Sequence, residues 1–350
     1  MLRPKRGVAE LLGFALFSAW GALACPQATS PPSGVPTIHV STDLIEVPVL
    51  VFKPPFRAVS GLVEKNFVIR LDGGMPFYPN YVHAQGSEPL SLSLLVDAET
   101  SEPEKLSLGL QTALQRWPVD LLHGTDRLSV YVFGCRLIRT LNESPVDLKL
   151  SRGAVVDATS LSTFQAAIEG GRTCHQPPID VVLDAAISQI AHTSGWKVVL
   201  MIVNGERTVN AYTLGKVRIA AAAAGVTLLV IKYVYGLRLP PLIYSTTEPF
   251  NLLSASLGGV SVYSSFGDFG EATETLIDHI RRRYILSFPR PGNGTAGVHS
   301  LEVSTNVRGA IVRSSTASAP LLDDAPCTSN DGLRLCPDHR PQYGTKRPPE

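Results

Sequence analysis

Short apolar runs alternate with amphipathic stretches in the central part of the chain, residues 89–284. Each run has the length of a strand that is buried on both faces and is too short to span a membrane as a helix. The predicted strands are residues 92–96, 128–133, 198–203, 226–234 and 260–263. The stretches between them predict helices over residues 103–117, 181–192, 212–224 and 271–283. We therefore predict a doubly wound α/β fold, with helices on both faces of a mostly parallel sheet.

The segments on both sides of this domain alternate apolar and polar residues, which is typical of half-buried strands. They cover residues 37–88 before the domain and residues 285–314 after it. Asp72 and Gly73 mark a turn in the first segment, and Pro-Gly-Asn-Gly at residues 291–294 marks a turn in the second. Isolated hairpins are only marginally stable. We therefore predict that the two segments pair to form one small β-rich module.

The first 24 residues have the pattern of a secretory signal peptide. Arg3, Lys5 and Arg6 precede an apolar stretch over residues 11–23 that ends in small residues. This stretch is shorter than the roughly 20 residues of a membrane-spanning helix. We predict a Pro/Ser/Gly-rich linker over residues 25–36 and a disordered, Pro-rich tail over residues 315–350. The protein is therefore expected to be exported, to the periplasm, the cell surface or the medium.

The five cysteines fit an oxidising compartment. Cys25 follows the predicted cleavage point, where a bacterial lipoprotein carries its lipid-modified cysteine, so a membrane tether through Cys25 is one alternative. The other four allow three pairings, and we favour Cys135 with Cys174 and Cys327 with Cys336. In the alternative, Cys135 is a buried free thiol on a strand.

Composition narrows the class of function. Hydrophobic residues make up 44% of the chain, which excludes disorder for most of it. The formal charge of +1 comes without long runs of one sign, so the charge gives no reason to expect binding to nucleic acid. The sequence has no phosphate-binding loop, dinucleotide fingerprint, zinc motif or nucleophile elbow. A binding protein is therefore favoured over an enzyme.

Oxygen-bearing side chains follow the first predicted strand of the domain directly. Asp97, Glu99 and Ser101 stand at its carboxyl end. Ligands of open α/β sheets bind beside the carboxyl ends of the strands, so the pattern predicts the functional site here.

Two other groups of charged residues carry no predicted function. Asp184 is expected to be a solvated or helix-capping residue. Arg281, Arg282 and Arg283 are expected to form a solvated helix end, where cations complement the helix dipole.

The chain resembles the von Willebrand factor type A family, and more closely the bacterial proteins described as having a related domain. Four stretches within residues 38–313 carry the resemblance: residues 61–67 with Asp72 and Gly73, the strand that ends in Asp97, residues 183–186 followed by 197–206, and residues 257–259 through 283–286. The resemblance implies a type A-like, Rossmann-like α/β domain and a role in protein binding or adhesion.

The family holds a divalent cation in a metal-ion-dependent adhesion site, written Asp-x-Ser-x-Ser on the first loop, Thr on the second and Asp on the third. One coordination position is left for a carboxylate of the partner. This chain keeps only half of the motif: Asp97 and Ser101 match, Glu99 replaces the first Ser, Asp180 stands where the family has Thr, and Asn204 replaces the third-loop Asp. The resemblance thus implies a degenerate metal site formed by these five residues.

Three states of this site remain open. Glu99 could close the site as an internal ligand, the loops could prefer Ca²⁺ over Mg²⁺, or no cation could bind. Three functions follow: an exported, non-enzymatic adhesion or envelope-assembly protein that binds a protein partner; a metal-dependent hydrolase using Asp97, Glu99 and Asp180; or a purely structural envelope protein without metal.

Overall fold

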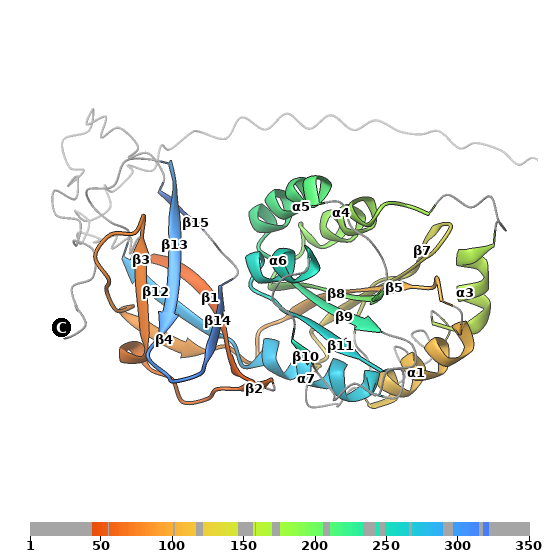
Figure 1. The fold of residues 1–350 in the computed structure, drawn as a ribbon, viewed down its shortest axis with the longest axis horizontal. Coiled ribbons are helices and arrows are strands. Elements are labelled where there is room, and N and C mark those ends of the chain that lie inside the picture. Colours follow the sequence, from red (N-terminus) through yellow and green to blue (C-terminus); the bar gives the residue numbers. More distant parts are fainter. Residues whose placement is uncertain are drawn as a thin grey trace, which may run out of the picture. The chain divides into compact units, whose positions relative to one another are not determined.

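The structure is a computed structural model, shown in Figure 1. It describes residues 44–54, 56–100, 102–116, 122–145, 157, 159–169, 176–205, 211–233, 243–244, 249–265, 268–289, 297–314 and 318–321. These residues all belong to one compact unit. The predicted signal peptide, linker and tail lie outside the described residues, as do Cys25, Ser101, Cys174, Cys327 and Cys336.

A seven-stranded sheet forms the centre of the α/β domain, in the order β10-β11-β9-β8-β5-β6-β7. Its strands are β5 (Leu90–Asp97), β6 (Arg127–Phe133), β7 (Leu137–Pro145), β8 (Trp196–Asn204), β9 (Val226–Tyr233), β10 (Ile243–Tyr244) and β11 (Ser261–Ser264). The five inner strands pair in parallel, and the edge strands β7 and β10 pair antiparallel to their neighbours. The predicted doubly wound, mostly parallel sheet is confirmed.

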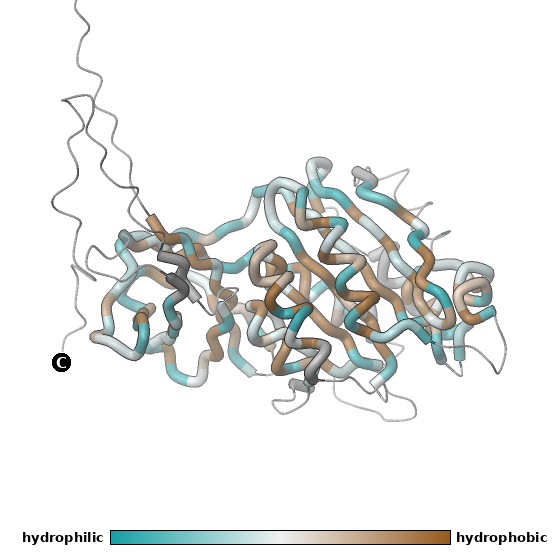
Figure 2. The backbone as a smooth tube through the Cα atoms, turned by 90° about the horizontal axis from the view of Figure 1, so that it is seen from above, coloured by the Kyte–Doolittle hydropathy of each residue, from teal (hydrophilic) through white to brown (hydrophobic). Residues whose placement is uncertain are grey.

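Helices cover both faces of this sheet (Figure 1). They are α1 (Pro103–Arg116), α3 (Leu161–Ile168), α4 (Ile179–Ile190), α5 (Ala211–Ala224), α6 (Pro249–Ser256) and α7 (Phe269–Arg281). Side chains alternate along each strand, so β5 supplies Leu94 and Val96 to the core beneath α1 and α7, and Leu95 to the core beneath α4, α5 and α6. All eight residues of β5 are buried, which explains its continuous apolar run. The hydrophobic residues, brown in Figure 2, concentrate along these central strands.

The segments that flank the domain pair to form a separate β-rich module, as predicted. Its strands are β1 (Leu44–Lys53), β2 (Arg57–Ala58), β3 (Phe67–Leu71), β4 (Tyr81–Ala84), β12 (Tyr284–Pro289), β13 (Gly297–Thr305), β14 (Ile311–Ser314) and β15 (Ser318–Leu321), with a short 3-10 helix at Glu64–Asn66. One sheet has the order β14-β1-β12-β4, with β2 beside β1, and the other has the order β15-β13-β3. Each sheet therefore combines strands that precede the α/β domain in the chain with strands that follow it. The two sheets enclose a hydrophobic core of their own that includes Phe67, Ile69 and Phe288.

The basic run at the end of α7 corrects one prediction, because two of its three arginines are buried. Arg281 is 6% exposed and Arg283 is 7% exposed, whereas Arg282 points to solvent. The Arg281 guanidinium forms an ion pair with the buried carboxylate of Asp126 and donates to the Glu88 carbonyl oxygen at 2.8 Å. The run is therefore mostly an internal anchor rather than a solvated helix end.

Arg283 lies against Trp196 at the same junction. Its guanidinium carbon is 3.8 Å from the centre of the Trp196 ring, and its Nε donates to the Gln85 side chain at 2.7 Å. The Trp196 indole N–H donates to the carboxylate of Glu88 at 2.7 Å. Burial lowers the pKa of Arg283 to about 9. These contacts tie the end of α7 to the strands where the chain enters the domain.

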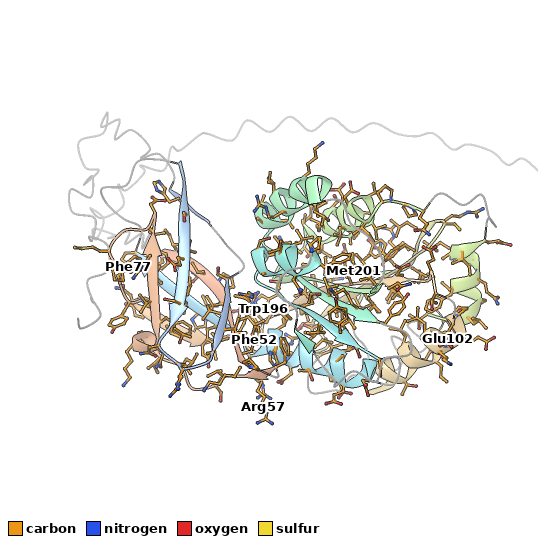
Figure 3. The ribbon with its side chains drawn as sticks, in the orientation of Figure 1. Phe52, Arg57, Phe77, Glu102, Trp196 and Met201 are labelled. Atoms are coloured by element: carbon orange, nitrogen blue, oxygen red, sulfur yellow. The ribbon has the colours of Figure 1, made fainter. Side chains whose placement is uncertain are left out.

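His279 of α7 forms a second contact between the domain and the β-rich module. Its ring stacks on Phe56, with centroids 4.3 Å apart and planes 5° from parallel, and Phe52 of β1 packs beside them. Phe52 and Trp196, labelled in Figure 3, both lie where the two sets of strands meet. Burial lowers the pKa of His279 to about 4, so this imidazole is neutral at pH 7.

Candidate functional site

The predicted site residues that the structure describes lie at one edge of the central sheet. Asp97 ends β5, and Asn204 ends β8, the parallel neighbour of β5. Asp180 is in the first turn of α4, and this helix leads through residues 191–195 to the start of β8 at the opposite edge. The start of α4 is therefore at the carboxyl edge, with Asp97 and Asn204. Ser101 lies outside the described residues.

Hydrogen bonds within the chain hold the loop after β5 in place. Asp97 is fully buried, and its Oδ1 accepts from the backbone N–H of Glu99 at 3.1 Å. The next residue, Ala98, donates its N–H to the carbonyl oxygen of Phe133 on β6 at 2.8 Å. The Thr100 hydroxyl accepts from the N–H of Glu102 at 3.1 Å, just before α1 begins. The loop is therefore fixed at both of its ends.

Tyr233, the last residue of β9, holds the same loop through its side-chain hydroxyl. It is fully buried, and its hydroxyl lies 3.1 Å from the carbonyl oxygen of Asp97 and 3.4 Å from that of Glu99. Tyr233 therefore holds the backbone of residues 97–99, and the Glu99 side chain is exposed. Tyr233 was not predicted as a site residue, since in sequence it is part of an apolar run.

Lys232 places a buried cation at the same edge. It is 1% exposed, and its ammonium group donates to the Tyr263 hydroxyl on β11 at 3.0 Å. Burial lowers its pKa to about 8, so it is mostly protonated at pH 7. The side chains of Lys232 and Tyr233 lie on opposite faces of the sheet, because side chains alternate along a strand. In the sequence, a lysine inside the apolar run of residues 226–234 is the signal that could have identified Lys232 as a buried cation.

The described carboxylates do not by themselves make up a cation site. Among the residues that the structure describes, no group of three or more His, Cys, Asp or Glu is arranged to hold a metal ion. Glu99 is exposed, Asp180 is half-buried, and Asp184 is exposed, as predicted for a solvated helix residue. Mg²⁺ needs about six oxygens in close geometry. The five-residue metal site of Asp97, Glu99, Ser101, Asp180 and Asn204 therefore stays a prediction, and we derive no step that passes through a cation.

Two remaining predictions meet the structure only in part. Cys135 is disulfide-bonded, but the other four cysteines lie outside the described residues, so the pairing with Cys174 stays a prediction. Within the described residues, no helix is both long and apolar enough to cross a membrane.

The strand order, the helices on both faces and the loops at the carboxyl edge define a doubly wound α/β domain framed by a β-rich module. No protein-family model and no curated protein sequence matches the chain.

Several solved structures are similar to the chain at low identity. The von Willebrand factor type A protein from Catenulispora acidiphila is 11% identical with a TM-score of 0.43, over 82% of this chain and 76% of that one. BatB from Bacteroides thetaiotaomicron is 16% identical with a TM-score of 0.39, over 55% and 98%. The manganese-loaded TRAP protein of Plasmodium vivax is 16% identical with a TM-score of 0.37, over 68% and 97%. The fold therefore rests on the strand order described above, and the function rests on the site.

Proposed function

We propose that the chain is an exported, non-enzymatic binding protein, whose loops at the carboxyl edge of the central sheet contact a protein partner. The observation that carries the proposal is the fixed loop after β5. Tyr233 and the Asp97 carboxylate hold the backbone of residues 97–99, and the Glu99 side chain is exposed. Placement in the cell envelope, through export and a tether at Cys25 or by secretion, is part of the same proposal.

A loop fixed in this way is suited to binding because little conformational entropy is lost when the partner binds. The exposed carboxylate of Glu99 gives the loop a charged contact that does not depend on a bound cation. We therefore propose that the partner offers a basic group to Glu99, and that binding persists without divalent ions. The partner of a metal-ion-dependent adhesion site would instead offer an acidic group.

Photo-crosslinking in the host cell tests the proposed surface. A photoreactive amino acid replaces Glu99 in one variant and Ser194, an exposed residue at the opposite edge of the sheet, in the control. We expect the variant at residue 99 to give a discrete protein adduct, identified by mass spectrometry, that the control does not give. The same adducts from both positions would contradict the proposal, because contact would not be specific to the carboxyl edge.

The role of Glu99 and of cations is tested on the purified protein. The partner identified by crosslinking is titrated in buffer containing chelator, and Glu99→Gln should weaken its binding by about tenfold, the loss of one charged contact. Calorimetric titration with Mg²⁺, Mn²⁺ and Ca²⁺ before and after Glu99→Ser tests the cation site. Partner binding that requires one of these ions would refute cation-independent binding. Turnover of ester or phosphate substrates that Asp97→Ala abolishes would favour the hydrolase instead.

A further inference from the structure

A shallow, largely apolar groove lies between helices α5 and α6, and none of its lining residues belongs to the loop after β5. Its volume is about 260 Å³. Leu214 of α5 and Leu253 of α6 contribute side chains that are each only 5% exposed, whereas Leu252 on its border is 62% exposed. Ile219, one helical turn beyond Gly215, is 68% exposed. Single exposed apolar residues are common on protein surfaces, so the groove needs a further observation to indicate binding.

Gly215 provides that observation. It lines the groove in the interior of α5, a helix otherwise rich in alanine. Glycine is among the poorest helix formers, and inside a helix it usually allows another part of the chain to pack closely. Here a Cβ atom built on residue 215 would meet no atom within 4 Å. Packing within the chain therefore does not require the glycine, and the space it leaves opens into the groove.

The charge of the two helices indicates what the groove would bind. Their only charged residues are Lys216 and Arg218, both exposed, and Arg218 lines the groove. A second copy of the same surface would bring like charges together, which disfavours self-association through this face. An acidic partner would be attracted to it.

We propose that the groove between α5 and α6 binds a short segment of a partner protein, with an aliphatic side chain seated over Gly215 and an acidic side chain paired with Arg218. The floor of Leu214 and Leu253 supplies apolar contact, and Leu252 covers the aliphatic side chain from the border. This surface shares no residue with the loop at Asp97, so the proposal can be tested independently of the function proposed above.

Peptide selection on the purified protein tests both the groove and the chemistry of its occupant. A displayed library of random 12-residue peptides is selected on the wild type and depleted on Gly215→Trp, in which an indole fills the groove. We expect enriched peptides to combine an aliphatic residue with a neighbouring Asp or Glu. A synthetic peptide of the enriched sequence should bind Gly215→Trp and Arg218→Glu at least about tenfold more weakly than the wild type.

Two further variants separate loss of binding from loss of structure. Ala220→Trp adds the same indole to the exposed side of α5 and should bind the peptide like the wild type. Gly215→Ala should raise the midpoint of thermal unfolding, because alanine favours the helix, and should still weaken peptide binding. Opposite changes in stability and binding cannot arise from misfolding.

Three results of the peptide experiments would overturn the proposal. They are the absence of any enriched sequence, enrichment of sequences without acidic residues, and equal binding of the selected peptide to the wild type and to Gly215→Trp. A dimer that forms in solution and is broken by Gly215→Trp would also overturn it, because the groove would then bind a second copy of the chain.

Discussion

Replacing Asp126 with alanine should destabilise the protein by about 4 kcal/mol. The Asp126 carboxylate accepts from the backbone N–H of Leu90 at 2.8 Å and from that of His123 at 2.7 Å, and it forms an ion pair with Arg281. The two side chains of this pair are 1% and 6% exposed. Removing one partner of a buried pair costs roughly 3–5 kcal/mol, because the Arg281 charge stays buried without its counter-ion and the N–H groups of Leu90 and His123 lose their acceptor.

Urea unfolding followed by circular dichroism measures this loss. With a slope of about 3 kcal/mol per molar urea, a loss of 4 kcal/mol lowers the midpoint by roughly 1.3 M. The matched control is Arg282→Ala, which removes an exposed ion pair with Asp278 one turn away and should cost at most about 0.5 kcal/mol. The double variant Asp126→Ala/Arg281→Met should lose less stability than Asp126→Ala alone, since it leaves no unpaired cation. A loss below about 1 kcal/mol for Asp126→Ala would refute the reasoning from burial.

Three further predictions use the same unfolding measurement. His279 is neutral in the folded chain because burial lowers its pKa to about 4, whereas the unfolded chain binds the proton near pH 6.5. Stability should therefore fall by about 2 kcal/mol from pH 6.5 to 5, and His279→Phe should lack this part of the acid sensitivity. Gly259→Ala should lower the free energy of unfolding by more than ~1 kcal/mol, the loss expected at an unobstructed glycine with positive φ, because its Cβ would lie 1.9 Å from the Leu228 carbonyl oxygen. Gly225→Ala is the control, because φ is +68° there and the space is open. An equal loss for the two variants would contradict this prediction. Tyr233→Phe should cost about 1 kcal/mol and speed amide hydrogen exchange in the loop after β5, and unchanged exchange would show that the hydroxyl does not hold that loop.

The inner strands and the main helices could be predicted because burial on both faces of the sheet leaves a continuous apolar run. The edge strands β7 and β10 could not, since an edge strand needs no such run and β10 has only two residues. Helices α3 and α6 have eight residues each, which is too short for a clear helical period.

The buried arginines show where local sequence gives the wrong environment. Arg281 follows a charged helix face, and its partner Asp126 is 155 residues earlier in the chain. Only the folded topology brings the two residues together, so the sequence alone predicts a solvated helix end for this run.

The candidate site was predicted in part. The rule that ligands bind at the carboxyl ends of strands pointed to Asp97, and the resemblance added Asn204. The structure places the two at the ends of neighbouring parallel strands. The support from Tyr233 depends on β9 being two strands away from β5, which local sequence does not show.

The pairing of the two flanks has a consequence for the order of folding. Val59 and Tyr284 are joined by a hydrogen bond across 225 residues. Among the described strands, β1 pairs with its neighbour β2 and with β12 and β14 of the C-terminal flank. During synthesis, β1 emerges before β12 and β14 and lacks these two partners until they follow. The intervening α/β domain contains all the strands of its own sheet, so it can fold while β1 waits. Until then the edges of β1 that β12 and β14 later cover stay unpaired, and unpaired strand edges of a nascent chain are prone to aggregate.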